Sequence, residues 1–212
     1  MKQNTLSMAG VLAAALIAGC ANTAQESAAK VSDAEVHQVI MASFKEKGQA
    51  GMDRLNQSEL QKACSLAALD PKGLPQSKRT ELEQAALAAV KYPADGKYLG
   101  DWKAGEKIAQ TGVGLQFSDK PDTPAGGNCY ACHQLAPQEL SYGNLGPSLY
   151  QYGKLRGNSE EIMKYTWAKI WNSHAYNACS NMPRFGAEGI LTEEQLKDVM
   201  ALLMAPDSPV NK

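Results

Sequence analysis

The chain has 212 residues, of which 44% are hydrophobic and 20% are charged, and its formal net charge at pH 7 is -1. This composition suits one or two small folded domains with apolar cores. A nucleic-acid-binding domain would need a strongly basic face, which a sequence pI of about 6.3 does not favour. The 3 histidines and 5 cysteines are few enough to be interpreted one by one.

The first nineteen residues are interpreted as a secretory signal peptide, not as part of the fold. Lys2 supplies a positive start, and the apolar run over residues 8–18 is too short to span a bilayer. Small residues then precede Cys20, which resembles the lipobox of bacterial lipoproteins and predicts a lipid on Cys20. An ordinary signal peptide cleaved nearby is the alternative. Either reading places the mature chain in the periplasm, and Ala21 after the cysteine permits sorting to the outer membrane.

A helical N-terminal extension is expected over residues 33–98, after a small and polar tether over residues 20–32. Apolar residues at helical spacing predict a first helix from Asp33 to Lys47. Two more helices are expected, and the prolines Pro71 and Pro93 end them. Their ranges are 57–68 and 77–91. No period-2 alternation is long enough to predict a core strand.

The character of the sequence changes after Pro93, where short helices alternate with long loops rich in glycine and proline. Helices are expected over 101–111 and 159–172. A last helix starts at Thr192, where Gln195 completes a capping box. This order resembles that of a class I cytochrome c domain. The predicted fold class is therefore all-α, with a class I cytochrome c domain over residues 99–212 following the extension.

The residues Cys129-Tyr130-Ala131-Cys132-His133 form a complete C-x-x-C-H motif. Two thiols three residues apart share one face of a helical turn, so both can reach the two vinyl groups of one porphyrin. The adjacent His133 can then bind the iron, and the motif is typical of covalent attachment of haem c. A thioredoxin-like redox pair would need a βαβ context, and a zinc site would need a second ligand pair. We therefore predict one covalent haem c with its iron, bound through Cys129, Cys132 and His133.

The remaining ligands follow from the segments after the motif. Pro147 lies where class I cytochromes c place a proline whose carbonyl accepts a hydrogen bond from the haem histidine, which would make Pro147 part of the cofactor site. Met182 is followed by Pro183 in a loop, which predicts Met182 as the sixth iron ligand. His174 is the main alternative. Three further methionines fall in predicted helices, where methionine more often fills the core. They are Met163, Met200 and Met204.

Cys64 and Cys179 are left after lipidation and haem attachment are assigned. An exported protein with two remaining cysteines is expected to join them in a disulfide, because such bonds persist in oxidising compartments. This bridge would fasten the extension beside the predicted sixth ligand. A reactive thiol at Cys179 is the alternative.

Three runs together resemble the SoxX family, the mono-haem cytochrome subunits of the SoxXA thiosulfate-oxidising complex. These runs are Asn128–His133, Gly143–Leu149 and Ala178–Gly186, and the stretch 54–57 leading to Cys64 fits the same family. The run Cys-Ser-Asn-Met-Pro-Arg-Phe-Gly over residues 179–186 is the discriminating one, since the haem motif alone fits many cytochromes. The similarity covers residues 54–205.

The resemblance implies an electron-accepting subunit of a heteromeric L-cysteine S-thiosulfotransferase, with no catalytic residue in this chain. A SoxA-like di-haem or mono-haem cytochrome would carry the active-site haem. Thiosulfate would be joined there to a cysteine of the SoxYZ carrier, and a diffusible cytochrome would accept the electrons. Contacts with the SoxA-like subunit are expected near the exposed haem edge, although Arg184 could instead pair with a haem propionate. The expected contact residues are Tyr130, Gln134, Leu135, Arg184 and Phe185.

Two other classes of function stay open at this point. A free-standing respiratory electron shuttle needs only the haem domain, so the extension of roughly eighty residues argues against it. A ligand-sensing or peroxidase haem would need an open sixth position, which a Met182 ligand would close.

Overall fold

The computed structural model describes residues 31–212, so the predicted signal peptide, Cys20 and most of the tether lie outside the described residues. Within that range the chain is helical, with an isolated bridge between Lys47 and Ala50 in place of any strand. This confirms the all-α prediction. No described helix is long and apolar enough to cross a membrane. The structure divides into two compact units after Lys45, whereas the bounds set from the sequence fall at residues 33 and 98.

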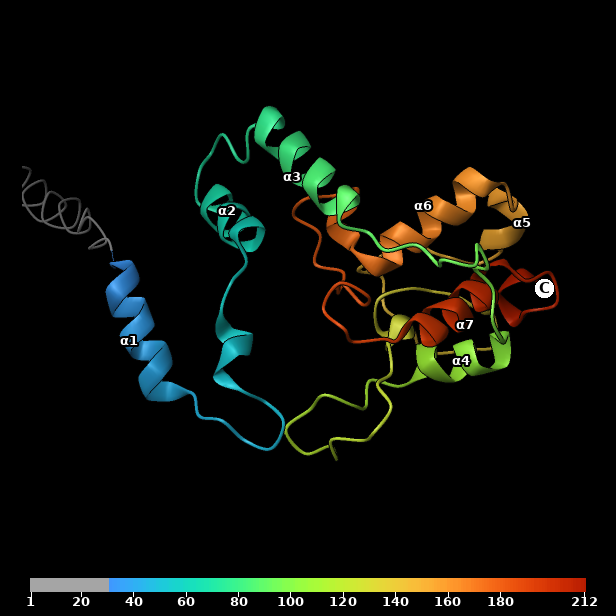
Figure 1. Cartoon of the computed structure of the whole chain (residues 1–212), viewed down its shortest axis with the longest axis horizontal. Helices are drawn as coiled ribbons and strands as arrows, with labels where there is room; N and C mark the ends of the chain where they lie inside the picture. The colour runs from blue at the N-terminus through green and yellow to red at the C-terminus, as the bar shows by residue number, and fades with distance from the viewer. Residues whose placement is uncertain (1–30) are drawn as a thin grey trace, which may run out of the picture. The chain divides into compact units, whose positions relative to one another are not determined.

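Helix α1, Asp33–Ser43, is the regular element of the first unit within the described residues (Figure 1). Its N-terminus is capped by a capping box. Ser32 Oγ accepts a hydrogen bond from the Glu35 amide, and the Glu35 carboxylate accepts one from the Ser32 amide. The helix ends at Ser43, four residues before the predicted end, because the extended backbone of Phe44 terminates it.

The second unit is built on the crossing of two helices, α4 (Trp102–Gln110) and α7 (Glu193–Met204), which lie side by side in Figure 1. Gly105 makes the close approach possible, since a Cβ there would lie 2.1 Å from the Asp198 carbonyl oxygen. The predicted capping box of Thr192 and Gln195 starts α7. Helix α6, Glu160–Trp171, packs on α7, and its Trp167 is 1% exposed.

One helix of this unit was not predicted. Helix α5, Tyr152–Arg156, lies within the stretch 143–157 that was expected to be a loop. It begins after Gln151 in a left-handed conformation (φ 55°) and stops at Gly157 (φ 75°), so backbone geometry that periodicity does not reveal sets both ends.

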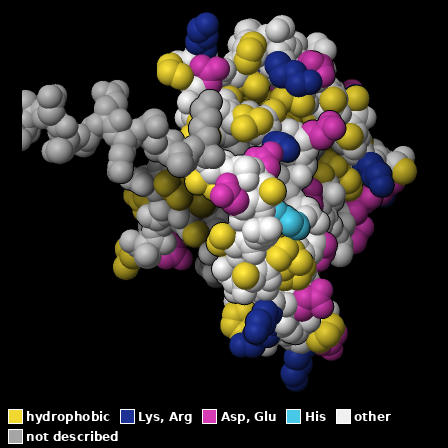
Figure 2. Space-filling view, turned by 90° about the vertical axis from the view of Figure 1, so that its left-hand side faces the viewer, with side chains coloured by type: hydrophobic (Ala, Val, Ile, Leu, Met, Phe, Trp, Pro, Cys, Tyr) yellow, Lys and Arg dark blue, Asp and Glu magenta, His cyan; other side chains and the backbone are white. Residues whose placement is uncertain are grey.

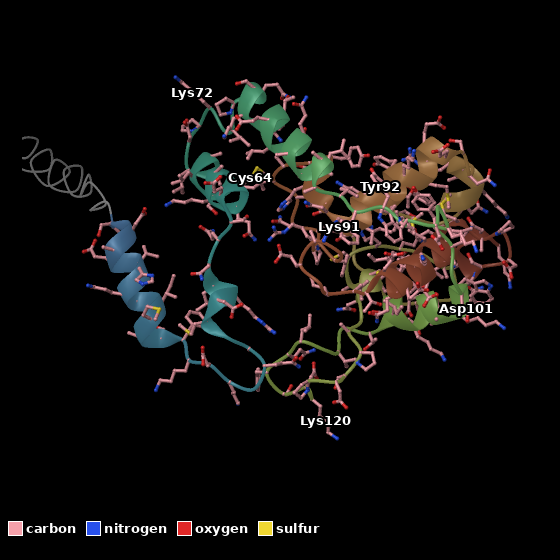
Figure 3. The ribbon with its side chains drawn as sticks, in the orientation of Figure 1. Cys64, Lys72, Lys91, Tyr92, Asp101 and Lys120 are labelled. Atoms are coloured by element: carbon pink, nitrogen blue, oxygen red, sulfur yellow. A yellow bond between two sulfur atoms is a disulfide. The ribbon has the colours of Figure 1, made fainter. Side chains whose placement is uncertain are left out.

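Helices α2 (Glu59–Ala68) and α3 (Gln76–Ala88) belong to the same unit as the later helices. The segment after α3 runs along α6, where the Trp167 indole donates to the Lys91 carbonyl at 2.8 Å (Figure 3). The Tyr98 ring meets Trp167 edge-on at 5.7 Å between centroids. On the face drawn in Figure 2, acidic and basic side chains are interspersed, so no basic patch suited to nucleic acid covers it.

Candidate haem site

The C-x-x-C-H motif forms a single turn after α4, with Cys129–Ala131 in a 3-10 helix. Asn128 enters the turn in a left-handed conformation (φ 46°), and both the Cys132 and His133 amides donate to the Cys129 carbonyl, at 3.1 and 2.9 Å. Neither Cys129 nor Cys132 is in a disulfide. Burial raises the pKa of the Cys129 thiol to about 12.

His133 is held by the backbone that follows the motif. Its Nδ1 lies 2.7 Å from the Pro147 carbonyl oxygen, which is the contact that the sequence predicts for this proline. With Nδ1 donating to Pro147, Nε2 is the nitrogen left for iron. Gly146 lies flat against the imidazole, because a Cβ there would be 2.1 Å from Cε1 and 2.7 Å from Nε2. These features fit the requirements of a proximal haem ligand.

Met182 lies in the long loop between α6 and α7, and its half-buried side chain packs against the apolar core. The backbone of the residue is fixed on both sides. Ser173 Oγ donates to the Met182 carbonyl at 2.6 Å, and the Met182 amide donates to Ser180 Oγ at 3.2 Å. A fixed loop backbone is suited to presenting a thioether to iron, and the role of Met182 as sixth ligand stays a prediction.

The other candidate ligands are engaged elsewhere. His174 is 5% exposed, and its Nε2 lies 3.2 Å from the Ser180 carbonyl oxygen. Burial lowers the pKa of His174, which favours a neutral ring in that contact. The three helical methionines are all buried in the core: Met163, Met200 and Met204.

The predicted disulfide between Cys64 and Cys179 is confirmed. The Cα atoms lie 5.5 Å apart, and the bond joins α2 to the loop three residues before Met182 (Figure 3, where Cys64 is labelled). The structure therefore does not support a free thiol at Cys179. A groove of about 660 Å³ opens beside this bridge, lined by Leu60, Cys64 and Cys179 together with Met182 and Arg184.

The structure corrects three of the expected partner contacts. Tyr130, Leu135 and Phe185 are only 5%, 1% and 5% exposed, so their side chains pack inward and do not form a contact surface. Gln134 and Arg184 stay partly accessible. The Arg184 guanidinium is 2.8 Å from the Glu188 carboxylate, one turn further along the chain.

An acidic residue that sequence reasoning missed lies behind the motif. Tyr130 Oη donates to the Glu106 carboxylate of α4, at 3.1 and 3.3 Å from its two oxygens, and Gln110 Nε2 donates at 2.9 Å. Burial raises the pKa of Glu106, while the Tyr130 hydrogen bond acts in the opposite direction. Burial also raises the pKa of Tyr130, and Glu106 adds to that rise. No spacing in the sequence marks this contact, since Glu106 and Tyr130 are 24 residues apart.

Comparison with known proteins agrees with this geometry. Residues 103–205, which contain the motif, Pro147 and Met182, match the family model described as Cytochrome c. Residues 103–205 therefore form a cytochrome c domain. A protein of Aquifex aeolicus (strain VF5), named "Uncharacterized lipoprotein", is 38% identical over 158 residues, which cover 74% of this chain and 73% of the relative. The cytochrome c domain implies covalently bound haem c and a function in electron transfer.

Proposed function

We propose that the chain is the electron-accepting cytochrome of a SoxXA-type thiosulfate-oxidising complex, with His133 and Met182 as iron ligands. A histidine–methionine pair gives haem c a raised reduction potential, as an acceptor requires. The observation that supports this role most is the covalent link between the extension and the Met182 loop through Cys64 and Cys179. An electron shuttle that meets its partners only briefly has no need of such an extension.

In the proposed reaction, the S–H bond of a carrier thiol breaks and its sulfur forms a sulfur–sulfur bond with thiosulfate on the SoxYZ carrier, which releases one proton and two electrons. Chemistry on the carrier cysteine belongs to the SoxA-like partner. One haem iron takes up one electron at a time, so this chain would pass the two electrons on singly to a diffusible cytochrome.

A surface suited to a partner flanks the motif. The segment between His133 and Pro147 exposes two leucines almost completely, Leu140 at 94% and Leu145 at 86%, and Tyr142 is 47% exposed. Large apolar side chains grouped at the surface often mark protein interfaces. We assign this surface, together with Arg184, to the contact with the SoxA-like subunit, in place of the buried residues expected from the sequence.

We further propose that Cys20 carries a lipid that holds the complex at the periplasmic face of a membrane. The lipobox-like sequence and the name of the Aquifex relative support this anchoring. In cell fractionation, Cys20→Ala should move the protein from the membrane to the soluble fraction. A mature N-terminus other than lipidated Cys20 in mass spectrometry would contradict the proposal.

The decisive test combines isolation with reconstitution. The native protein should be recovered with a SoxA-like cytochrome, and its haem should be reduced by thiosulfate only when SoxA and SoxYZ are present. Leu140→Ser should weaken the complex and leave the haem spectrum unchanged, with the exposed Leu155→Ser on α5 as a matched control. Recovery of the protein alone, without thiosulfate-dependent reduction, would establish the free shuttle instead.

A further inference from the structure

The contact between Glu106 and Tyr130 places a half-buried carboxylate behind the haem-attachment turn. Tyr130 is the first residue between the two cysteines, so its ring is fixed by the same turn that fixes Cys129 and Cys132. The hydroxyl of Tyr130 reaches both oxygens of Glu106, and the negative charge of Glu106 acts on the Cys129 sulfur. The pKa of a carboxylate in this position depends on the charge of a group bound at that turn.

The charged groups around Glu106 do not neutralise it. Glu139, in the segment after the motif, is acidic, and Tyr130 and Gln110 contribute neutral donors. On α7, which packs against α4, Lys197 contacts Asp95, Glu193 and Glu194, while Asp198 accepts the Asp101 amide. Among the described residues, none forms an ion pair with Glu106.

A polar hollow that opens to solvent lies next to the hydrogen-bond partners of this carboxylate. A hollow of about 460 Å³ opens to the surface and is lined by Tyr130 and Gln110, the two hydrogen-bond partners of Glu106. Asn128, Glu139 and Ser141 line it as well, so the walls are polar enough to hold water. The hollow therefore reaches both hydrogen-bond partners of Glu106, and a proton relayed through them does not cross the apolar core.

We propose that Glu106 is a proton acceptor coupled to reduction of the haem. When the iron gains one electron, the Glu106 carboxylate binds one proton from the hollow, and it releases that proton when the iron is oxidised again. The electron comes from the donor that the cytochrome serves and the proton comes from water. The inference requires only the haem of the cytochrome c family and does not depend on the identity of the partner.

The sign of the effect follows from electrostatics. An added electron makes the site more negative, which raises the pKa of Glu106 in the reduced protein above its value in the oxidised protein. The reduction potential should therefore fall as the pH rises between these two pKa values. This pH range, the coupling window, starts above 4.5, the ordinary pKa of a glutamate, because burial already raises the pKa of Glu106. A shift of roughly tenfold in the proton affinity corresponds to about 59 mV in the potential.

Potentiometric titration of the holoprotein from about pH 4 to 9 tests the proposal, with the ordinary carboxyl pKa inside that range. Glu106→Gln should remove the Glu106 step and give a higher potential than the natural protein above the window. Tyr130→Phe should keep the step and move it to higher pH, because the lost hydroxyl no longer stabilises the carboxylate. Glu160→Gln, an exposed change at the start of α6, is the matched control and should leave the curve unchanged.

Titration of the haem propionates is common to all variants, so the difference between the curves isolates Glu106. Identical curves for the natural protein and Glu106→Gln would overturn the proposal. If Glu106→Gln does not retain haem, the Tyr130→Phe curve decides, and an unmoved step refutes the coupling. The infrared difference between reduced and oxidised natural protein provides a second readout, since uptake of the proton adds a protonated carboxyl band inside the window. Absence of that band also refutes the proposal.

Discussion

Removing the disulfide tests how strongly the extension is fastened to the haem domain. The bridge closes a loop with a sequence separation of 115 residues. In the chain-entropy description, cross-linking a loop of this length restricts the unfolded state by about 5 kcal/mol, which is an upper value. Contacts that do not involve the bridge stay in place, including the hydrogen bond from the Ala178 amide to Glu83 at 3.0 Å. We expect the double variant Cys64→Ser/Cys179→Ser to lose about 3–5 kcal/mol of unfolding free energy.

Urea unfolding of the oxidised holoprotein, followed by circular dichroism, measures this loss. The dependence on urea should also become steeper, because an unfolded chain without the cross-link is less compact. Ser65→Ala is the matched control on α2, since the Ser65 hydroxyl accepts a hydrogen bond from Gln57 just before that helix and takes no part in the bridge, and we expect a change within about 0.5 kcal/mol. A loss below about 1 kcal/mol in the double variant would refute the reasoning, since it would mean that the cross-link hardly restricts the unfolded chain.

Three further predictions concern single residues. Met182→Ala should abolish the weak charge-transfer band of methionine-bound ferric haem and lower the reduction potential, whereas an unchanged spectrum would exclude Met182 as a ligand. Gly146→Ala should reduce the haem content per protein, measured by absorbance, because the new Cβ would lie 2.1 Å from the His133 ring; full haem content would contradict the close packing. Trp167→Phe should cost about 1–3 kcal/mol in urea unfolding, because it leaves the Lys91 carbonyl without its donor, and unchanged stability would show that water replaces the indole.

The features that the sequence predicted are those dictated by covalent chemistry or by strong backbone signals. A C-x-x-C-H turn needs its residues in sequence, so Cys129 to His133 could be found without a structure. Parity of the cysteines in a chain predicted to be exported was enough to pair Cys64 with Cys179, because each of the others already had a predicted role. Capping signals such as that of Thr192 and Gln195 located helix starts to within two residues.

The features that the sequence did not predict depend on how irregular segments fold onto the core. Periodicity says which side of a helix is buried, but it says nothing of a loop, so the burial of Leu135 and Phe185 was missed. The nearly full exposure of Leu140 could not be anticipated for the same reason. The pair of Glu106 and Tyr130 needs α4 to pack against the motif, which spacing along the chain does not reveal.

The arrangement around Met182 explains why α2 and α3 belong to the same unit as the cytochrome c domain. His133, the predicted histidine ligand, is held by Pro147 and the adjacent turn. Met182 lies in a loop with little regular structure, so the position of the loop depends on bonds to other segments. Residues of α2 and α3 supply two of these, the disulfide of Cys64 and the carboxylate of Glu83 at the Ala178 amide. Helices α2 and α3 therefore stabilise the loop that holds Met182, the predicted sixth ligand, as the turn and Pro147 stabilise His133.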